Sequence, residues 1–185
     1  LLITYPRLSA FDSPYARFCL HSFLFASSFY DHLKTNSWHK SGVFLMSHDD
    51  SSFKRQNSLL NAKADNELFE ELSHEEASKK AGLQLNNGGI FFEKGGYIEP
   101  KALCQDLLSH KNINLKLTSK VEKIYTDKDI LTLSSNGEVS EYQEVCLCAG
   151  YTSKKLLNFS GLSSKRGQIS YVNSSKEFEN LKFPI

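Results

Sequence analysis

Few residues in this sequence combine the chemistry and the spacing of a known catalytic or metal site. His74–Glu76 is similar to the start of a metalloprotease motif, but no second histidine follows at the required spacing. None of the six histidines stands with a cysteine at the spacing of a nucleophile and its base. We therefore expect no metal site, and no catalytic residue can be named from the sequence.

No two of the four cysteines are separated by two intervening residues, the C-x-x-C spacing that is typical of zinc and redox sites. Cysteine is also among the residue types most often found buried. The sequence therefore predicts free, mostly buried thiols at Cys19, Cys104, Cys146 and Cys148.

The stretch GGYIEPKALC, residues 95–104, is the clearest candidate for a segment beside a ligand. Pro100 suits the first turn of a helix, because the N–H that proline lacks would have no partner there. Gly95 and Gly96 either adopt a backbone conformation that a Cβ forbids or let another backbone or a ligand come close. A plain strand-to-helix turn and a turn beside a bound group both remain open.

The composition is that of a globular protein. The chain has 185 residues, 40% hydrophobic and 23% charged, enough for one compact domain or two interleaved smaller ones. Its formal charge of +1 neither demands nor excludes a polyanionic partner. The local basic pairs Lys154-Lys155 and Lys165-Arg166 are candidates for nucleic-acid contact, against the alternative of a solvated face.

The sequence contains no apolar run of about 20 residues and no signal peptide, so we expect a soluble, cytoplasmic protein without membrane contact. The chain begins without methionine on the strand-like LLITY and stops at LKFPI. We expect it to be a fragment of a larger protein.

Most of the expected elements in the first half are helices with clear end signals. Ser13 and Pro14 start a helix of about five turns. A capping box of Ser73 and Glu76, with Gly82 beyond, bounds residues 74–81. A third helix covers residues 100–110. We expect the helix residues that recur at three- and four-residue steps to face the core: Tyr15, Phe18, Ser22, Phe25, Phe29, Leu33, Leu103, Leu107 and Leu108.

Strands are expected mainly on either side of these helices. Residues 38–46 form a strand broken at Gly42, followed by a loop and a short helix, and two short strands flank the glycines before Pro100. Beyond the third helix, strands are expected at 113–119, 121–127 and 129–143, with Asn136-Gly137 as a hairpin turn.

The last part of the chain suggests half of a nucleotide-binding α/β domain. Residues 144–150, EVCLCAG, form an apolar strand buried on both faces. Such a strand ending in glycine is where open α/β sheets place ligands. A helical turn at 153–157 follows, and residues 163–172 return as a strand with Gly167 at the start of that strand.

The order of these motifs resembles the FAD-dependent D-amino-acid oxidase superfamily. The matching segments are Gly95–Pro100, Val121–Ile124, Cys148–Gly150 and Arg166–Gln168. Within the superfamily, residues 5–33 and 95–103 are similar to the branch that modifies the wobble uridine of tRNA.

The resemblance implies an α/β fold. A partial FAD-binding domain, Rossmann-like and of the glutathione-reductase type, would be interleaved with an antiparallel-sheet substrate domain of α+β class. Residues 1–94 would supply a helix of the FAD domain and most of the substrate domain. Residues 95–162 would belong to the FAD-binding domain, and residues 163–185 would return to the substrate domain.

The implied activity is transfer of a hydride from the carbon of a C–N bond to FAD, which gives an imine that water hydrolyses. In the tRNA-modifying branch, this removes the carboxymethyl group of carboxymethylaminomethyl-uridine as glyoxylate, and a fused upstream methyltransferase then acts on the product. Two alternatives remain: an oxidase of small free amines such as glycine or sarcosine, and a non-catalytic relic that serves as a binding module.

The resemblance also implies roles for particular residues. The backbone of Val121 would meet the adenine, Ala149 and Gly150 the nucleotide, and Gly167 and Gln168 the region next to the flavin. The flavin or substrate side would hold Tyr5, Arg7, Gly95, Gly96 and Tyr97. The family's phosphate-binding G-x-G-x-x-G is absent from these residues and lies upstream in related chains. We therefore expect this chain alone to bind FAD weakly and to be inactive.

Overall fold

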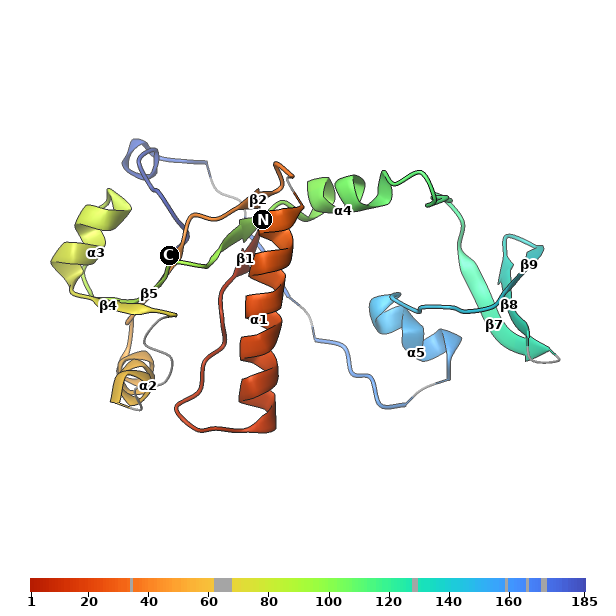
Figure 1. The fold of residues 1–185 in the computed structure, drawn as a ribbon, viewed down its shortest axis with the longest axis horizontal. Coiled ribbons are helices and arrows are strands. Elements are labelled where there is room, and N and C mark those ends of the chain that lie inside the picture. Colours follow the sequence, from red (N-terminus) through yellow and green to blue (C-terminus); the bar gives the residue numbers. More distant parts are fainter. Residues whose placement is uncertain (34, 62–67, 128–129, 159, 166, 171–172) are drawn as a thin grey trace. The chain divides into compact units, whose positions relative to one another are not determined.

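The computed structural model describes residues 1–33, 35–61, 68–127, 130–158, 160–165, 167–170 and 173–185. The chain divides into two compact units. The first combines Leu1–Ile113 with Asn173–Ile185, and the second is Asn114–Val172. Figure 1 shows the order of the elements along the chain.

The first unit contains a small antiparallel sheet in the order β1-β6-β2. It consists of β1 (Leu2–Thr4), β6 (Gly96–Ile98) and β2 (Trp38–His39). The central strand β6 begins at Gly96, the second residue of the Gly95-Gly96 pair, and both neighbours come from the first 40 residues. The strands that the sequence predicts on either side of the break at Gly42, and before Pro100, are confirmed.

A second antiparallel sheet has the order β3-β5-β4 and carries the core. Its strands are β3 (Val43–Met46), β5 (Gly89–Phe92) and β4 (Glu70–Leu72), and every residue of β5 is buried. Because side chains alternate along a strand, Phe91 packs into one apolar cluster and Ile90 and Phe92 into another. The helices α2 (Asp50–Asn61) and α3 (His74–Ala81) lie on opposite sides of this sheet (Figure 1). A sheet with apolar residues on both faces thus acquires a helix on each face.

The helix starts follow the capping signals. In α1 (Pro14–His32), the N–H of Ala16 donates to Oγ of Ser13 at 3.1 Å. In α3 the predicted capping box is present, and Gly82 ends the helix at a φ of +75°. Helix α4 (Pro100–Leu108) starts as predicted, with Pro100 in its first turn, and ends two residues before the predicted end at 110.

The faces that these helices bury differ from the prediction. Tyr15, Phe18, Phe25 and Phe29 of α1 are exposed, whereas Phe23 and Ser27 are buried. Phe25 stands about 200° around the helix from Phe23, so the apolar stripe lies opposite the face that contacts the sheets. Leu107 and Leu108 of α4 are also exposed rather than inward, and α4 has no buried residue.

The second unit is built on an antiparallel meander in the order β7-β8-β9. It consists of β7 (Val121–Asp127), β8 (Ile130–Ser135) and β9 (Glu138–Tyr142). Asn136 and Gly137 both have positive φ, +52° and +83°, which is the geometry of a type I′ hairpin turn. The short helices η1 (Gly150–Thr152) and α5 (Ser153–Leu156) follow, and η2 (Lys176–Phe178) lies in the part of the chain that returns to the first unit.

Three predicted strands are not formed. Residues 113–119 and 144–150 have no strand, and neither do the described residues of 163–172. A strand buried on both faces needs hydrogen-bonded neighbours and covering layers. None of the described strands pairs with residues 144–150. Cys146 and Cys148 are consequently exposed, as is Cys104, while Cys19 is half-buried, so the predicted burial of the thiols is wrong although all four are free.

All strand pairs among the described residues are antiparallel. The chain therefore mixes helices with antiparallel sheets, and the Rossmann-like parallel arrangement stays a prediction. Across the described ranges, no helix combines the length and the apolar character that a membrane crossing requires.

Candidate functional site

The sheet β1-β6-β2 brings together residues that the sequence places far apart. In the register of β1 and β6, Ile3 lies opposite Tyr97 and Thr4 opposite Gly96. Tyr5 continues directly from the end of β1. Four of the five residues expected on the flavin or substrate side therefore lie in this sheet or directly beside it: Tyr5, Gly95, Gly96 and Tyr97.

The two glycines of this segment are required by the close approach of neighbouring backbone. A Cβ on Gly96 would lie 2.1 Å from the carbonyl oxygen of His39, far inside van der Waals contact. A Cβ on Gly95 would lie 3.0 Å from the carbonyl oxygen of Thr4. Neither glycine has a positive φ. Of the two explanations of the glycine pair, close approach is therefore the one that the structure supports, and the approaching groups are backbone and side-chain atoms of this chain.

Several side chains in and after β1 are accessible. Tyr5 and Arg7, which follow the strand, are exposed. The ring of Tyr5 also lies near the second sheet, with its centroid 6.1 Å from that of Phe92 in β5. Ile3, which is exposed, lies opposite the half-buried Tyr97. We call Ile3, Tyr5, Arg7 and Tyr97 together the β1–β6 face.

The β1–β6 face also includes a histidine that sequence reasoning missed. His39 of β2 lies opposite Tyr97, and the two rings stack with centroids 4.4 Å apart and an interplanar angle of 16°. Nε2 of His39 is 3.3 Å from Oε1 of Glu99. No local motif marks His39, because its partners are set by strand register across about 60 residues.

The residues expected at the nucleotide end lie in the second unit and are not gathered into one pocket. Val121, half-buried at the start of β7, lines a pocket of about 570 Å³ with residues of β8 and β9. Ala149, Gly150, Gly167 and Gln168 are exposed and do not line that pocket. Arg166, part of the matching motif, lies outside the described residues.

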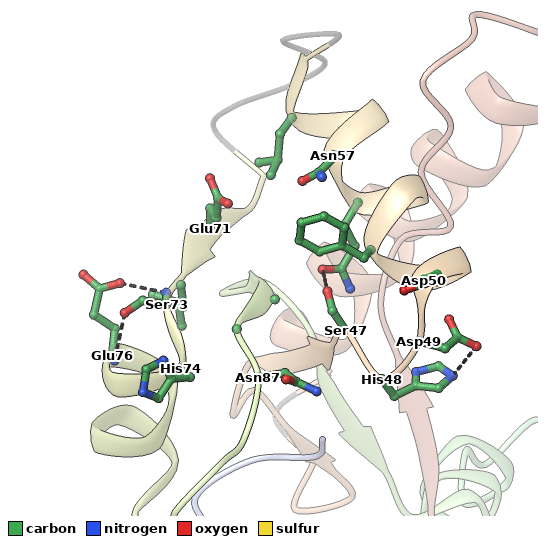
Figure 2. Close-up of a pocket in the computed structure, with 16 residues that line it drawn as sticks. Ser47, His48, Asp49, Asp50, Asn57, Glu71, Ser73, His74, Glu76 and Asn87 are labelled. Carbon is green, nitrogen blue, oxygen red and sulfur yellow. Dashed lines mark hydrogen bonds and ion pairs between the residues drawn. The ribbon is translucent and has the colours of Figure 1, made fainter.

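A pocket of about 690 Å³ in the first unit lies between the starts of α2 and α3 (Figure 2). Asp49, Ser73 and Glu76 of its polar lining take part in starting these helices. Oδ1 of Asp49 accepts from the N–H of Ser52 at 2.7 Å, and Glu76 accepts from the N–H of Ser73 at 2.8 Å. These backbone N–H groups, as the largest cause in each case, lower the pKa of Asp49 and of Glu76. Helix capping thus accounts for these carboxylates without a ligand.

The fold and the sequence together define the family. A family model described as FAD-dependent oxidoreductase matches residues 3–185, nearly the whole chain. The chain therefore belongs to the FAD-dependent oxidoreductase (DAO) family, and the resemblance seen in its motifs is confirmed.

Curated relatives carry one recurring name, tRNA 5-methylaminomethyl-2-thiouridine biosynthesis bifunctional protein MnmC. The protein from Legionella pneumophila (strain Lens) is 28% identical over 199 residues, which cover 99% of this chain and 28% of the relative. The protein from Pseudomonas entomophila (strain L48) is 34% identical over 114 residues, which cover 61% of this chain and 17% of the relative. The chain thus spans well under a third of the length of these relatives.

Solved structures show the same fold. Glycine oxidase from Geobacillus kaustophilus matches with a TM-score of 0.64 at 16% identity, over 82% of this chain and 44% of that one. L-proline dehydrogenase from P. horikoshii matches with a TM-score of 0.63 at 12% identity, over 88% of this chain and 46% of that one. At these identities the likeness establishes the fold and not the substrate.

The family implies FAD, and the described residues fit parts of such a site. Gly150 has a φ of +55°, and a Cβ there would meet no atom within 4 Å, so its backbone is open to close approach by a ligand. A Cβ on Gly167 would likewise meet open space. The β1–β6 face adds exposed aromatic and cationic side chains.

Proposed function

We propose that this chain is part of an FAD-dependent oxidoreductase that removes the carboxymethyl group from carboxymethylaminomethyl-(2-thio)uridine at the wobble position of tRNA. The products are aminomethyluridine and glyoxylate. The observation that carries the proposal is similarity across 99% of the chain to proteins named for tRNA 5-methylaminomethyl-2-thiouridine biosynthesis. The β1–β6 face supports it, because residues expected beside the flavin or substrate come together there.

Each unit would contribute residues that contact FAD or the substrate. In the second unit, backbone at Val121, Ala149 and Gly150 would hold the nucleotide end of FAD, with Gly167 and Gln168 toward the flavin. In the first unit, the β1–β6 face would meet the flavin or the substrate. The domain boundaries proposed for the longer protein are 1–94, 95–162 and 163–185.

When bound, FAD would supply the acceptor for the hydride that leaves the substrate carbon. The chain's own residues would orient the substrate. Arg7 is the cation on the β1–β6 face, and a guanidinium pairs with a carboxylate through two parallel hydrogen bonds. Arg7 would therefore bind the carboxylate of the carboxymethyl group, and Tyr5 and Tyr97 would border the modified base.

The proposal includes a fused methyltransferase upstream of this chain, a cytoplasmic location and contact with tRNA. Lys154 and Lys155 on α5 are the described basic pair for that contact. Replacing both with glutamate should weaken tRNA affinity and reduce its dependence on salt, because fewer counterions are released on binding. Titrations at several salt concentrations measure this slope. An unchanged slope would exclude the pair as a phosphate contact.

The decisive experiment is anaerobic mixing of the complete gene product, loaded with FAD, with tRNA that carries carboxymethylaminomethyl-uridine. Loss of flavin absorbance, with glyoxylate released, supports the proposal. Glycine and sarcosine are run in parallel. Bleaching by a small amine alone would instead identify an oxidase of free amines, and bound flavin that no substrate bleaches would indicate a non-catalytic module.

A further inference from the structure

The environment of Tyr97 contains two side chains that neither the motif nor the proposed function explains. The Tyr97 ring has Ile3 as its cross-strand neighbour on one side and stacks on His39 on the other. Stacked aromatic rings restrict each other's rotation, and a neighbour on each side leaves the ring few orientations.

The position of His39 is itself built by the sheet. Its carbonyl oxygen occupies the space that a Cβ on Gly96 would need, so the absence of a side chain at Gly96 lets β2 come close to β6. The N–H of Ser41 then donates to the carbonyl oxygen of His39 at 2.9 Å, which turns the chain immediately after β2. The backbone of His39 is therefore fixed by its close approach to Gly96 and by the hydrogen bond from Ser41.

Glu99 completes the arrangement in an unusual way. It is the N-cap residue of α4, but its side chain makes no capping hydrogen bond. Instead the carboxylate reaches Nε2 of His39 at 3.3 Å, while the N–H of Glu99 donates to the carbonyl oxygen of Ser37 at 2.9 Å. The Glu99 carboxylate thus contacts the His39 ring, which in turn stacks on Tyr97.

Folding stability does not account for the pair. The side chains of His39 and Glu99 are 37% and 52% exposed. Ion pairs with that much exposure contribute little to stability, because solvent screens them and both side chains lose freedom. The contact of His39 with Tyr97 therefore suggests a role in orienting the Tyr97 ring.

We propose that His39 and Glu99 are positioning residues that hold the ring of Tyr97 in the orientation it presents on the β1–β6 face. The inference rests on the proposed function, in which Tyr97 borders the flavin or the substrate. His39 acts through Tyr97 and touches neither of them. Glu99 acts one step further away, by holding His39.

A double-mutant cycle on the complete, FAD-loaded gene product tests the inference. The variants are His39→Ala, Tyr97→Phe, Tyr97→Ala and the double variant His39→Ala/Tyr97→Ala, with His39→Phe to keep a ring without the ion pair and Glu99→Gln to weaken the pair. The readouts are the absorption and fluorescence spectra of the flavin and the rate of its reduction at saturating substrate. His21→Ala and Glu75→Gln, exposed changes on α1 and α3, are the matched controls.

His39→Ala should shift the flavin spectrum and slow reduction by about ten- to a hundredfold, as expected for a misplaced group beside a reaction centre. His39→Phe should restore most of the spectrum. In the double variant the loss should equal that of Tyr97→Ala alone, because His39 has no target once Tyr97 is removed. The controls should match the wild type.

Additive losses, or an unchanged spectrum and rate in His39→Ala, would overturn the inference. The identity of the substrate does not affect this test. If glycine or sarcosine reduces the flavin and the tRNA does not, the same cycle is measured with that amine and tests the role of His39 equally well. A wild-type protein that binds no FAD would refute both proposals.

Discussion

The glycine pair shows how one missing side chain shapes this fold. A Cβ on Gly96 would lie 2.1 Å from the His39 carbonyl oxygen, whereas a Cβ on Gly95 would lie 3.0 Å from both the Thr4 carbonyl oxygen and Cγ2 of Val43. A ligand is not needed to explain either glycine. The side chains that could meet one are the half-buried Tyr97 on β6 and the exposed Tyr5, which directly follows β1.

Gly96→Ala tests this directly. A methyl group 2.1 Å from the His39 carbonyl cannot be accommodated without moving β2 away from β6. We expect the free energy of unfolding of the 185-residue chain to fall by about 1–3 kcal/mol, the usual cost of overpacking. Urea denaturation measures it. Gly167→Ala, where the methyl group meets open space, is the control, and equal stability of Gly96→Ala and the wild type would contradict the close-approach explanation.

Helix α1 shows how an element is anchored at its end. Ser27 donates to the carbonyl oxygen of Lys94 at 3.1 Å, next to the Gly95–Gly96 turn. Near its C-terminus, Asp31 accepts from Nε1 of Trp38 at 2.8 Å and pairs with Lys40 at 2.6 Å. These contacts tie one side of α1 to β2 and to the turn before β6. They decide which side of the helix is buried, whatever the distribution of its aromatic residues.

The pH dependence of stability should reveal this anchor. Lys40, as the main cause, together with Trp38, lowers the pKa of Asp31. A depressed pKa adds stability above the unfolded value, which is about 3.9 for aspartate, and that stability is lost as the pH falls through the folded pKa. Asp31→Asn should therefore be less stable than the wild type at neutral pH, by less than about 1 kcal/mol because the pair is partly exposed. The difference should close in acid, as measured by urea denaturation at a series of pH values, and a difference that persists there would exclude the carboxylate as its source.

The two sides of α1 should also respond differently to truncation. Phe23 is 5% exposed and Phe25 is 72% exposed. Phe23→Ala should cost about 3–5 kcal/mol in the 185-residue chain, whereas Phe25→Ala should change stability by less than about 0.5 kcal/mol. Thermal unfolding followed by circular dichroism distinguishes the two. Similar losses for both would mean that the aromatic stripe is core after all.

At the level of the chain, each unit holds some of the residues that are expected around FAD. The β1–β6 face belongs to the first unit, and the open glycines Gly150 and Gly167 belong to the second. Relatives of known structure share the fold over less than half of their own length.

FAD binding should therefore depend on more than these 185 residues. The chain lacks the G-x-G-x-x-G whose glycines and helix N-terminus hold the pyrophosphate. We expect equilibrium dialysis to show no stoichiometric FAD on the 185-residue chain and one FAD on the complete gene product. Tight binding by the short chain would show that the residues described above suffice.

Local sequence signals correctly predicted several features of the fold. The caps of α1 and α3, the first turn of α4 and the Asn136-Gly137 hairpin were all predictable, because each depends on interactions within a few residues. The family could also be predicted, because the order of short motifs survives at 28% identity to a relative. Tyr97 could be named from its motif in the same way.

The buried faces and the neighbours of Tyr97 could not be predicted in this way. Hydrophobic periodicity identifies an apolar side of α1, but only the positions of β2 and Lys94 decide that Phe23 and Ser27 face inward. His39 lies beside Tyr97 because of strand register. The side chain of Glu99 contacts His39 and does not cap α4. Helix caps and turns are local free-energy minima, whereas burial and pairing depend on which distant segments share the space, and tertiary structure alone settles that.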